Sequence, residues 1–210
     1  MKRLAIIGSG DLGQQIAYHA REDGHYKTAG FFDDFEVPGA IKHGLQVWGG
    51  VDDIVATFER GAFDCLMIGI GYKYMAFRQQ LYERFRNIVP FGKVIHTSSY
   101  VDKSATVGPG VFIYPGCVLD MGVEIKDNAL LNVGCTIAHH SSIGEGSFLS
   151  PGVKVAGFTE ISSGVILGIG TIVIDNIKIA PGVRTAGGAV VIEHLDRPGL
   201  YAGVPAQFKK

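Results

Sequence analysis

Residues 132–157 read NVGCTIAHHSSIGEGSFLSPGVKVAG, and in this stretch an aliphatic side chain recurs at every sixth position: Ile137, Ile143, Leu149 and Val155. The same phase continues in both directions without a gap over residues 101–179. A second phase, four residues later, holds only small or β-branched side chains over residues 105–183. Because Gly, Asn and Pro recur between these positions, the period predicts a solenoid in which each hexapeptide forms one short strand and one turn.

This repeat resembles that of the hexapeptide-repeat acyltransferases, in which three hexapeptides make one triangular coil of a left-handed parallel β-helix. The resemblance covers roughly residues 95–208. It includes the string YAGVPAQF at 201–208, which is similar to the G-V-P-A closing signature of that class. On this interpretation Cys117 and Cys135 lie one coil apart, and we expect both to be buried small hydrophobes.

The first 94 residues follow another pattern, in which short apolar runs alternate with amphipathic stretches. We expect strands at 4–7, 28–32 and 65–70 and helices at 14–21, 54–59 and 75–85, with 89–95 as a last strand or a linker. Parallel strands need crossover connections, which are usually helical, so the pattern predicts a small parallel sheet covered by helices. The expected fold is therefore an α/β Rossmann-like domain over 1–94 and an all-β left-handed parallel β-helix over 95–210.

The composition argues against nucleic acid and membrane surfaces as partners. The chain has 19 Lys and Arg against 20 Asp and Glu, so no broad field favours polyanions. The longest uncharged apolar stretch, 161–174, is too short to span a bilayer. The N-terminus lacks the pattern of a secretory signal, and the three cysteines show no metal-ligand spacing, so we expect a cytoplasmic protein.

His139 and His140 fall in the turn that follows the inward-facing Ile137. Spacing alone leaves open whether such a pair is a solvated corner or a functional site. The string around them, together with the N-terminal domain, resembles the bacterial sugar acetyltransferases. These include the sialic acid O-acetyltransferases and the UDP-4-amino-sugar (bacillosamine, perosamine) N-acetyltransferases. In that family a His in this turn is the general base, and His139 matches it; a base is needed because the attacking amine or hydroxyl must lose a proton.

The resemblance implies two further catalytic candidates. Gly157 matches the family glycine whose backbone N–H faces the acetyl carbonyl, as an oxyanion requires. Asn132 matches a family active-site Asn, and a corner Asn in a tight turn is the other interpretation.

The chain departs from the family at two places. His140 stands where relatives commonly have the Glu or Asp that orients the base, and Phe148 stands where some relatives have a second His. The orienting group therefore stays open, with Glu145 or Glu124 as possibilities, and His140 is itself an alternative base.

The last coils resemble those that hold coenzyme A in the family, so acetyl-CoA is the expected co-substrate. The small surfaces along which pantetheine would lie are formed by Gly157, Gly168, Ile169, Gly170, Ala186, Gly187 and Gly188. Basic residues are candidates for the nucleotide phosphates or are solvated charges: Lys178, Arg184, Arg197, Lys209 and Lys210.

The N-terminal domain contains GSGDLG at 8–13, with Asp33 and Asp34 further on. Gly8, Gly10 and Gly13 alone are typical of a dinucleotide site. In the acetyltransferases that the domain resembles, this loop and the acidic pair bind a nucleotide-linked sugar instead. Relatives often have Gly-His where this chain has Asp11 and Leu12.

A second loop of this domain, at 69–72, matches the family's other nucleotide-side loop. It contributes Gly71, and Arg78 follows in the next helix. A plain helix-surface charge is the alternative interpretation of Arg78.

The expected function is acetyl transfer from acetyl-CoA to a nucleotide-linked amino sugar for surface-glycan synthesis, with N-acetylation favoured over O-acetylation. One alternative is a non-catalytic nucleotide-binding scaffold or sensor. The other is a metal-dependent hydratase of the γ-carbonic anhydrase type, which needs three ligands where this chain has adjacent histidines. Family members assemble as homotrimers, and we expect association to cover outer-face residues such as Phe112, Tyr114 and Leu130.

Overall fold

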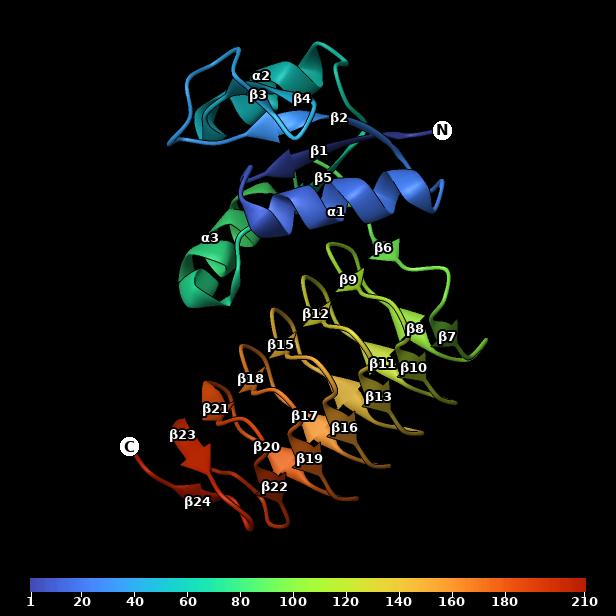
Figure 1. The fold of residues 1–210 in the computed structure, drawn as a ribbon, viewed down its shortest axis with the longest axis vertical. Coiled ribbons are helices and arrows are strands. Elements are labelled where there is room, and N and C mark those ends of the chain that lie inside the picture. Colours follow the sequence, from blue (N-terminus) through green and yellow to red (C-terminus); the bar gives the residue numbers. More distant parts are fainter. The chain divides into compact units, whose positions relative to one another are not determined.

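The computed structural model describes all residues, 1–210, and the chain forms two compact units, Met1–Val94 and Ile95–Lys210 (Figure 1). The first unit is α/β and the second is a stack of β coils, so the predicted fold class is confirmed. None of the helices has both the length and the apolar character that a bilayer span would need.

The first unit has a five-stranded sheet in the order β3-β4-β2-β1-β5. Four strands run parallel, and β3 pairs antiparallel with β4. The strands are β1 (Arg3–Ile7), β2 (Lys27–Phe32), β3 (Ile41–Lys42), β4 (Leu45–Gly49) and β5 (Cys65–Ile68).

The unit has three α-helices: α1 connects β1 to β2, α2 connects β4 to β5, and α3 follows β5. Helix α1 contacts β1 and β2, and α3 contacts β5. Buried side chains of the strands, α2 and α3 form an apolar core around Phe32, Leu66 and Phe85, and α1 buries Ile16 and Ala20 outside this core. The helices are α1 (Asp11–Glu22), α2 (Ile54–Glu59) and α3 (Met75–Phe85), with the short 3₁₀ turns η1 (Val51–Asp53) and η2 (Tyr72–Tyr74).

The second unit is a left-handed parallel β-helix with three walls. Each wall residue pairs in register with the residue three hexapeptides on; Val118, for example, pairs with Thr136. The first wall holds β7 (Tyr100–Val101), β10 (Val118–Leu119), β13 (Thr136–Ile137), β16 (Lys154–Val155), β19 (Ile172–Val173) and β22 (Val190–Val191). The second wall holds β8 (Thr106–Val107), β11 (Glu124–Ile125), β14 (Ser142–Ile143), β17 (Glu160–Ile161) and β20 (Lys178–Ile179). The third holds β6 (Val94–Ile95), β9 (Phe112–Ile113), β12 (Leu130–Leu131), β15 (Phe148–Leu149), β18 (Ile166–Leu167), β21 (Val183–Thr185), β23 (Gly199–Ala202) and the antiparallel β24 (Gln207–Phe208).

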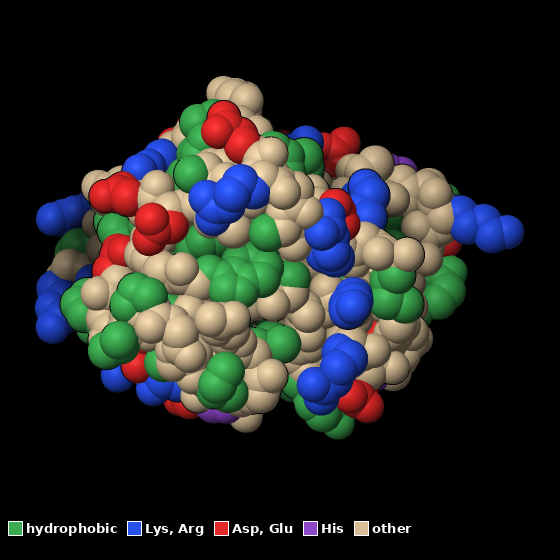
Figure 2. Space-filling view, turned by 90° about the horizontal axis from the view of Figure 1, so that it is seen from above, with side chains coloured by type: hydrophobic (Ala, Val, Ile, Leu, Met, Phe, Trp, Pro, Cys, Tyr) green, Lys and Arg blue, Asp and Glu red, His purple; other side chains and the backbone are tan.

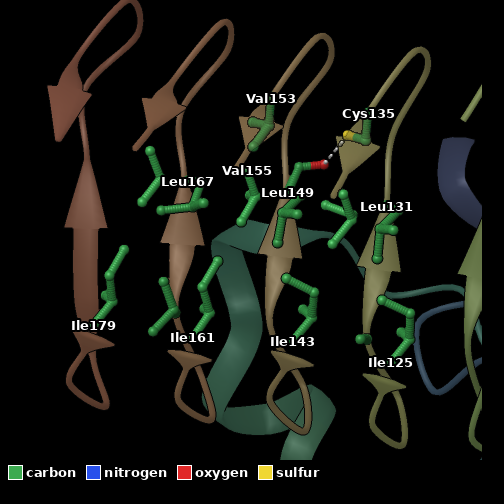
Figure 3. Close-up of a cluster of buried hydrophobic side chains, with 14 of the residues drawn as sticks. Ile125, Leu131, Cys135, Ile143, Leu149, Val153, Val155, Ile161, Leu167 and Ile179 are labelled. Carbon is green, nitrogen blue, oxygen red and sulfur yellow. Dashed lines mark hydrogen bonds between the residues drawn. The ribbon is translucent and has the colours of Figure 1, made fainter. Parts of the chain in front are cut away.

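The interior of the coils is a column of stacked aliphatic side chains, one from each strand (Figure 3). Leu131, Leu149 and Leu167 face the same axis from successive coils of the third wall. Cys117 and Cys135 are free and fully buried in this column, as expected, and each thiol lies near carbonyl oxygens of the next coil.

The expectation that Phe112, Tyr114 and Leu130 need a partner to cover them is wrong. Phe112 is 0%, Leu130 2% and Tyr114 5% exposed in the single chain. The rings of Phe112 and Tyr114 also pack on each other, with centroids 4.1 Å apart. Exposed apolar side chains lie instead on the first wall and its two corners, at Val118, Met121, Val133, Ile169, Ile172 and Ile174.

Charged side chains of both signs lie on the face that Figure 2 shows. On the face seen in Figure 2, Lys and Arg side chains are interspersed with Asp and Glu, with apolar side chains between them. This agrees with the formal net charge of -1.

Candidate active site

His139 and His140 lie in the turn that joins β13 to β14, at the corner between the first and second walls. Two backbone hydrogen bonds fix this turn to the coils on either side. The His140 N–H donates to the Met121 carbonyl (2.9 Å), and the His139 carbonyl accepts from the Phe158 N–H (3.1 Å). The turn is therefore part of the β-helix lattice.

The same turn is held from inside by Ser141, whose residue is 1% exposed. Its Oγ donates to the Ala156 carbonyl (2.9 Å) and accepts from the Thr159 N–H (3.0 Å). One buried hydroxyl thus joins the coil of His139 to the coil of Gly157, since these polar groups would otherwise be buried without partners.

The His139 ring lies directly against Gly157. A Cβ built on Gly157 would stand 2.6 Å from His139 Cε1, 2.9 Å from Nε2 and 3.1 Å from Nδ1, so any side chain there would collide with the imidazole. The Gly157 carbonyl accepts from the Asn176 N–H (3.0 Å), whereas its own N–H has no partner within the chain. The structure thus brings a half-buried imidazole beside an unengaged backbone donor.

A third ring, Phe158, completes the group, and sequence reasoning missed it. Phe158 stacks on His140 with centroids 5.3 Å apart and planes 11° apart, and it meets His139 edge-on at 5.0 Å. The Nδ1 atoms of the two histidines are 3.3 Å apart. We call His139, His140 and Phe158 the ring cluster.

Asn132 does not belong to this corner. It follows β12, at the corner between the third and first walls, whereas His139 follows β13. Its Oδ1 accepts from the Val133 N–H (2.8 Å), and its carbonyl accepts from the Cys117 thiol (3.2 Å). Within one chain, Asn132 is therefore a turn-forming residue.

Of the residues expected to contact pantetheine, Gly157 lies at the His139 corner, and the other six lie at the same corner as Asn132, on later coils: Gly168, Ile169, Gly170, Ala186, Gly187 and Gly188. Gly168 has a packing reason to be glycine, because a Cβ there would stand 2.6 Å from the Thr185 carbonyl oxygen. Ile169 projects outward and is 61% exposed. This corner offers a stripe of small residues beside an exposed aliphatic side chain.

In the first unit, the glycine loop after β1 is fixed by close backbone packing. Gly8 has φ +90°, and a Cβ on Gly13 would stand 2.0 Å from the Gly8 carbonyl oxygen. A Cβ on Gly69 would stand 2.5 Å from the Gly13 Cα. Gly10 faces open space, so among the three predicted glycines it is the one that packing does not require.

The acidic pair organises this edge of the sheet. Asp33 Oδ2 accepts from the Ser9 N–H (2.8 Å) and Oγ (2.7 Å), and Oδ1 accepts from the Phe35 N–H (3.0 Å). Burial acts to raise the pKa of Asp33, but these hydrogen bonds and the charge of Lys42 outweigh it, so that pKa lies below its usual range. Asp34 accepts from the Val51 N–H (2.7 Å) at the start of η1.

Arg78 is buried, so it is not a plain surface charge. Its residue is 2% exposed, and its guanidinium donates to the carbonyls of Ile68 and Ile70, at the end of β5 and in the loop that follows. Gly71 lies two residues beyond Gly69, at the N-cap of η2, with open space beside its Cα. Arg78 therefore fixes the loop that carries Gly71.

The other chemistry-bearing candidates are dispersed. No three His, Cys, Asp or Glu residues are placed to hold one metal ion. His194 accepts the Lys178 N–H at 3.1 Å, away from the ring cluster in sequence and coil. Arg197 stacks on the Phe208 ring at 4.1 Å, and Lys178 pairs with Glu160 on the surface.

Comparison with known proteins places this geometry in context. Residues 3–85 match the model of the PglD N-terminal domain family. Among curated proteins the sequence has no significant match.

Solved structures match over the whole chain. PerB from Caulobacter crescentus, solved with CoA and GDP-perosamine, has 26% identity and a TM-score of 0.91, over 100% of this chain and 98% of that one. The acetyltransferase domain of PglB from Neisseria gonorrhoeae, solved with acetyl coenzyme A, has 25% identity and a TM-score of 0.87, over 99% of each chain. WeeI from Acinetobacter baumannii, at 20% identity and a TM-score of 0.86 over 100% of each chain, shares the fold.

A parallel β-helix with an imidazole beside a free backbone N–H at one corner, preceded by a PglD-type domain, defines a left-handed β-helix acyltransferase. More narrowly, the chain resembles sugar-nucleotide N-acetyltransferases of the hexapeptide-repeat class over its whole length.

Proposed function

We propose that this protein transfers the acetyl group of acetyl-CoA to an amino group on a nucleotide-linked sugar, for surface-glycan synthesis. The proposal rests mainly on one observation: the His139 imidazole lies against Gly157, whose backbone N–H has no hydrogen-bond partner in the chain. The named contents of the related structures, CoA with GDP-perosamine in one and acetyl coenzyme A in another, support the choice of substrates.

His139 is the proposed general base. Its Nδ1 faces His140, which leaves Nε2 without a hydrogen-bond partner in the chain. Nε2 accepts the proton that the amine loses as its nitrogen attacks the thioester carbonyl. Such general-base assistance is worth about 10²- to 10⁴-fold in rate.

Gly157 is the proposed oxyanion donor. Attack converts the thioester carbonyl oxygen into an oxyanion, and a fixed backbone N–H stabilises that charge without reorganising. When the intermediate collapses, the C–S bond breaks and the thiolate takes the proton from His139 Nε2. The products are the N-acetyl sugar and free CoA, and the base returns to its neutral form.

The first unit is the proposed holder of the nucleotide-linked sugar. The Gly8–Gly13 loop exposes Gly10, and Arg78 holds the loop that carries Gly71. Asp33 and Asp34 already bind backbone N–H groups, so their proposed part in sugar-nucleotide binding is to shape this edge and to offer remaining carboxylate lone pairs.

A homotrimer in the cytoplasm is the proposed assembly. Val118 and Ile172 on the first wall are 37% and 44% exposed, and the corner residues Met121 and Val133 are 51% and 48% exposed. Such a band of apolar side chains favours association. In a trimer, the corner that carries Asn132 and Gly168–Gly170 in one subunit would lie beside the His139 corner of another, and the two corners would form one active site.

The proposal is tested by following CoA release from acetyl-CoA with UDP-, GDP- and CMP-linked amino sugars, together with CoA binding by calorimetry. We expect turnover with a 4-amino sugar nucleotide and a product whose acetyl group survives hydroxylamine, since an amide resists it and an ester does not. A labile product would establish O-acetylation. Absence of both turnover and CoA binding would overturn the proposal and leave a nucleotide-binding scaffold.

A further inference from the structure

Two members of the ring cluster occupy backbone positions that ordinarily carry glycine or asparagine. Equivalent turn positions on four successive coils all have left-handed backbones: Gly122 (φ 69°), His140 (φ 56°), Phe158 (φ 55°) and Asn176 (φ 60°). Glycine and asparagine adopt this conformation readily, whereas a bulky residue is strained there. Such strain is typical of functional sites.

The His140 ring lies between the Phe158 ring and the backbone of Gly122. Phe158 stacks on one face at an interplanar angle of 11°. On the other side lies Gly122, where an added Cβ would stand 3.0 Å from His140 Cδ2. The plane of the His140 ring is therefore set from both sides.

The orientation of His140 places its Nδ1 opposite Nδ1 of His139, 3.3 Å away. The two rings are 77° apart, so His140 presents its edge to His139. The side-chain hydrogen bond of both imidazoles is the one to each other, with no carboxylate partner. The histidine–histidine contact is thus the one polar interaction that orients either ring.

We propose that His140 is the positioning residue for His139, and that Phe158 acts through His140 by holding its ring in plane. His139 carries its proton on Nδ1 and donates it to the bare Nδ1 of His140, whose own proton is on Nε2. This tautomer leaves His139 Nε2 free to accept the proton of the nucleophile. The resulting imidazolium keeps its Nδ1–H shared with neutral His140.

This inference rests on the proposed role of His139, and one measurement tests it apart from turnover. We would record ¹⁵N imidazole spectra of the full chain labelled at histidine, with the His139→Ala spectrum to assign the signal. We expect His139 to be protonated at Nδ1 and bare at Nε2, and His140→Phe to abolish this preference. A His139 protonated mainly at Nε2 in the unaltered protein would overturn the proposal.

Kinetics supply the second test. His140→Phe keeps a ring on Phe158 but removes the acceptor, so we expect kcat to fall by about 10- to 100-fold with KM for both substrates unchanged. His140→Asp restores an acceptor in a residue that tolerates the left-handed backbone, and we expect most of kcat to return. Equal losses in both variants would contradict the positioning role.

Phe158→Gly separates positioning from stability, because glycine relieves the strained backbone while removing the stack. We expect kcat to fall several-fold while Tm holds or rises. Asn176→Gly, at the same turn position one coil on and outside the ring cluster, is the control and should keep kcat. Unchanged kcat in Phe158→Gly would overturn the role of Phe158. If His139→Ala itself retains full turnover, the proposed base fails rather than its positioning.

Discussion

Replacing Gly157 with alanine tests whether the position of the His139 imidazole controls the rate of the reaction. The added Cβ would stand 2.6 Å from His139 Cε1, and the ring must retreat by about 0.8 Å to restore an ordinary contact of about 3.4 Å. Gly157 does not have a left-handed backbone, so alanine introduces no backbone strain of its own. The ring cannot retreat toward Nδ1 without breaking its contact with His140.

We expect Gly157→Ala to lower kcat by about 100-fold, because a displacement near 1 Å of a reacting group costs about that much, equivalent to ~2.7 kcal/mol. The Gly157 N–H survives the substitution, so the loss reports on the imidazole and not on the oxyanion donor. Steady-state kcat and KM give the effect, and Tm shows whether the fold is intact.

A double-mutant cycle supplies the control. In a His139→Ala background the steric conflict is absent, so adding Gly157→Ala should change neither Tm nor the residual rate. If Gly157→Ala alone keeps kcat within threefold of the unaltered protein, the close packing of ring and glycine has no catalytic consequence and the reasoning fails.

Three further predictions concern the framework of the site. Ser141→Ala leaves the Ala156 carbonyl and the Thr159 N–H without their shared partner. We expect the free energy of unfolding, measured with denaturant, to fall by about 1–3 kcal/mol. The control Ser142→Ala, in strand β14, should lower it by under about 0.5 kcal/mol. Arg78→Met removes the donor shared by the Ile68 carbonyl at the end of β5 and the Ile70 carbonyl in the next loop, and should cost more, about 2–4 kcal/mol. Arg84→Met on the exposed face of the same helix should cost under about 1 kcal/mol, and equal costs would contradict the buried role. The depressed pKa of Asp33 means that its stabilisation is complete above the ordinary carboxyl pKa and is lost as pH falls through the lowered native value. Asp33→Asn should therefore flatten the acid limb of the stability profile below about pH 4, and Asp52→Asn should not.

The β-helix could be predicted residue by residue because its geometry leaves little freedom. Every predicted inward residue, from Val101 to Ile179, is the second residue of a two-residue strand. Helices α2 and α3 also have the predicted bounds, Ile54–Glu59 and Met75–Phe85. The hairpin of β3 and β4 was missed because two residues of β3 show no periodicity and its place is set by pairing with β4.

Outward-facing positions could not be predicted in the same way. The period shows which side chains leave the core of the coils but not how exposed each one is, and Phe112 and Leu130 are buried. Buried Arg78 is a similar case, since its partners are backbone carbonyls, which have no sequence signal.

Of the predicted catalytic residues, the structure brings some together at one corner and places another at a different corner. His139 and Gly157 are one coil apart, and the structure places them in contact. Asn132 lies only seven positions from His139 but on the preceding corner. Phe158 could have been found from the sequence. It occupies the same turn position as Gly122, His140 and Asn176 on neighbouring coils, and a bulky residue is unusual at a position that favours Gly or Asn.

The most direct test of His139 as the base is the kcat of His139→Ala with acetyl-CoA and the preferred amino sugar nucleotide, measured on protein that binds CoA normally. His194→Asn is the matched control, because asparagine can still accept the Lys178 N–H. We expect kcat to fall by about 10²- to 10⁴-fold in His139→Ala and to hold in the control. A His139→Ala protein that binds CoA and turns over within tenfold of the unaltered enzyme would contradict the assignment of the base.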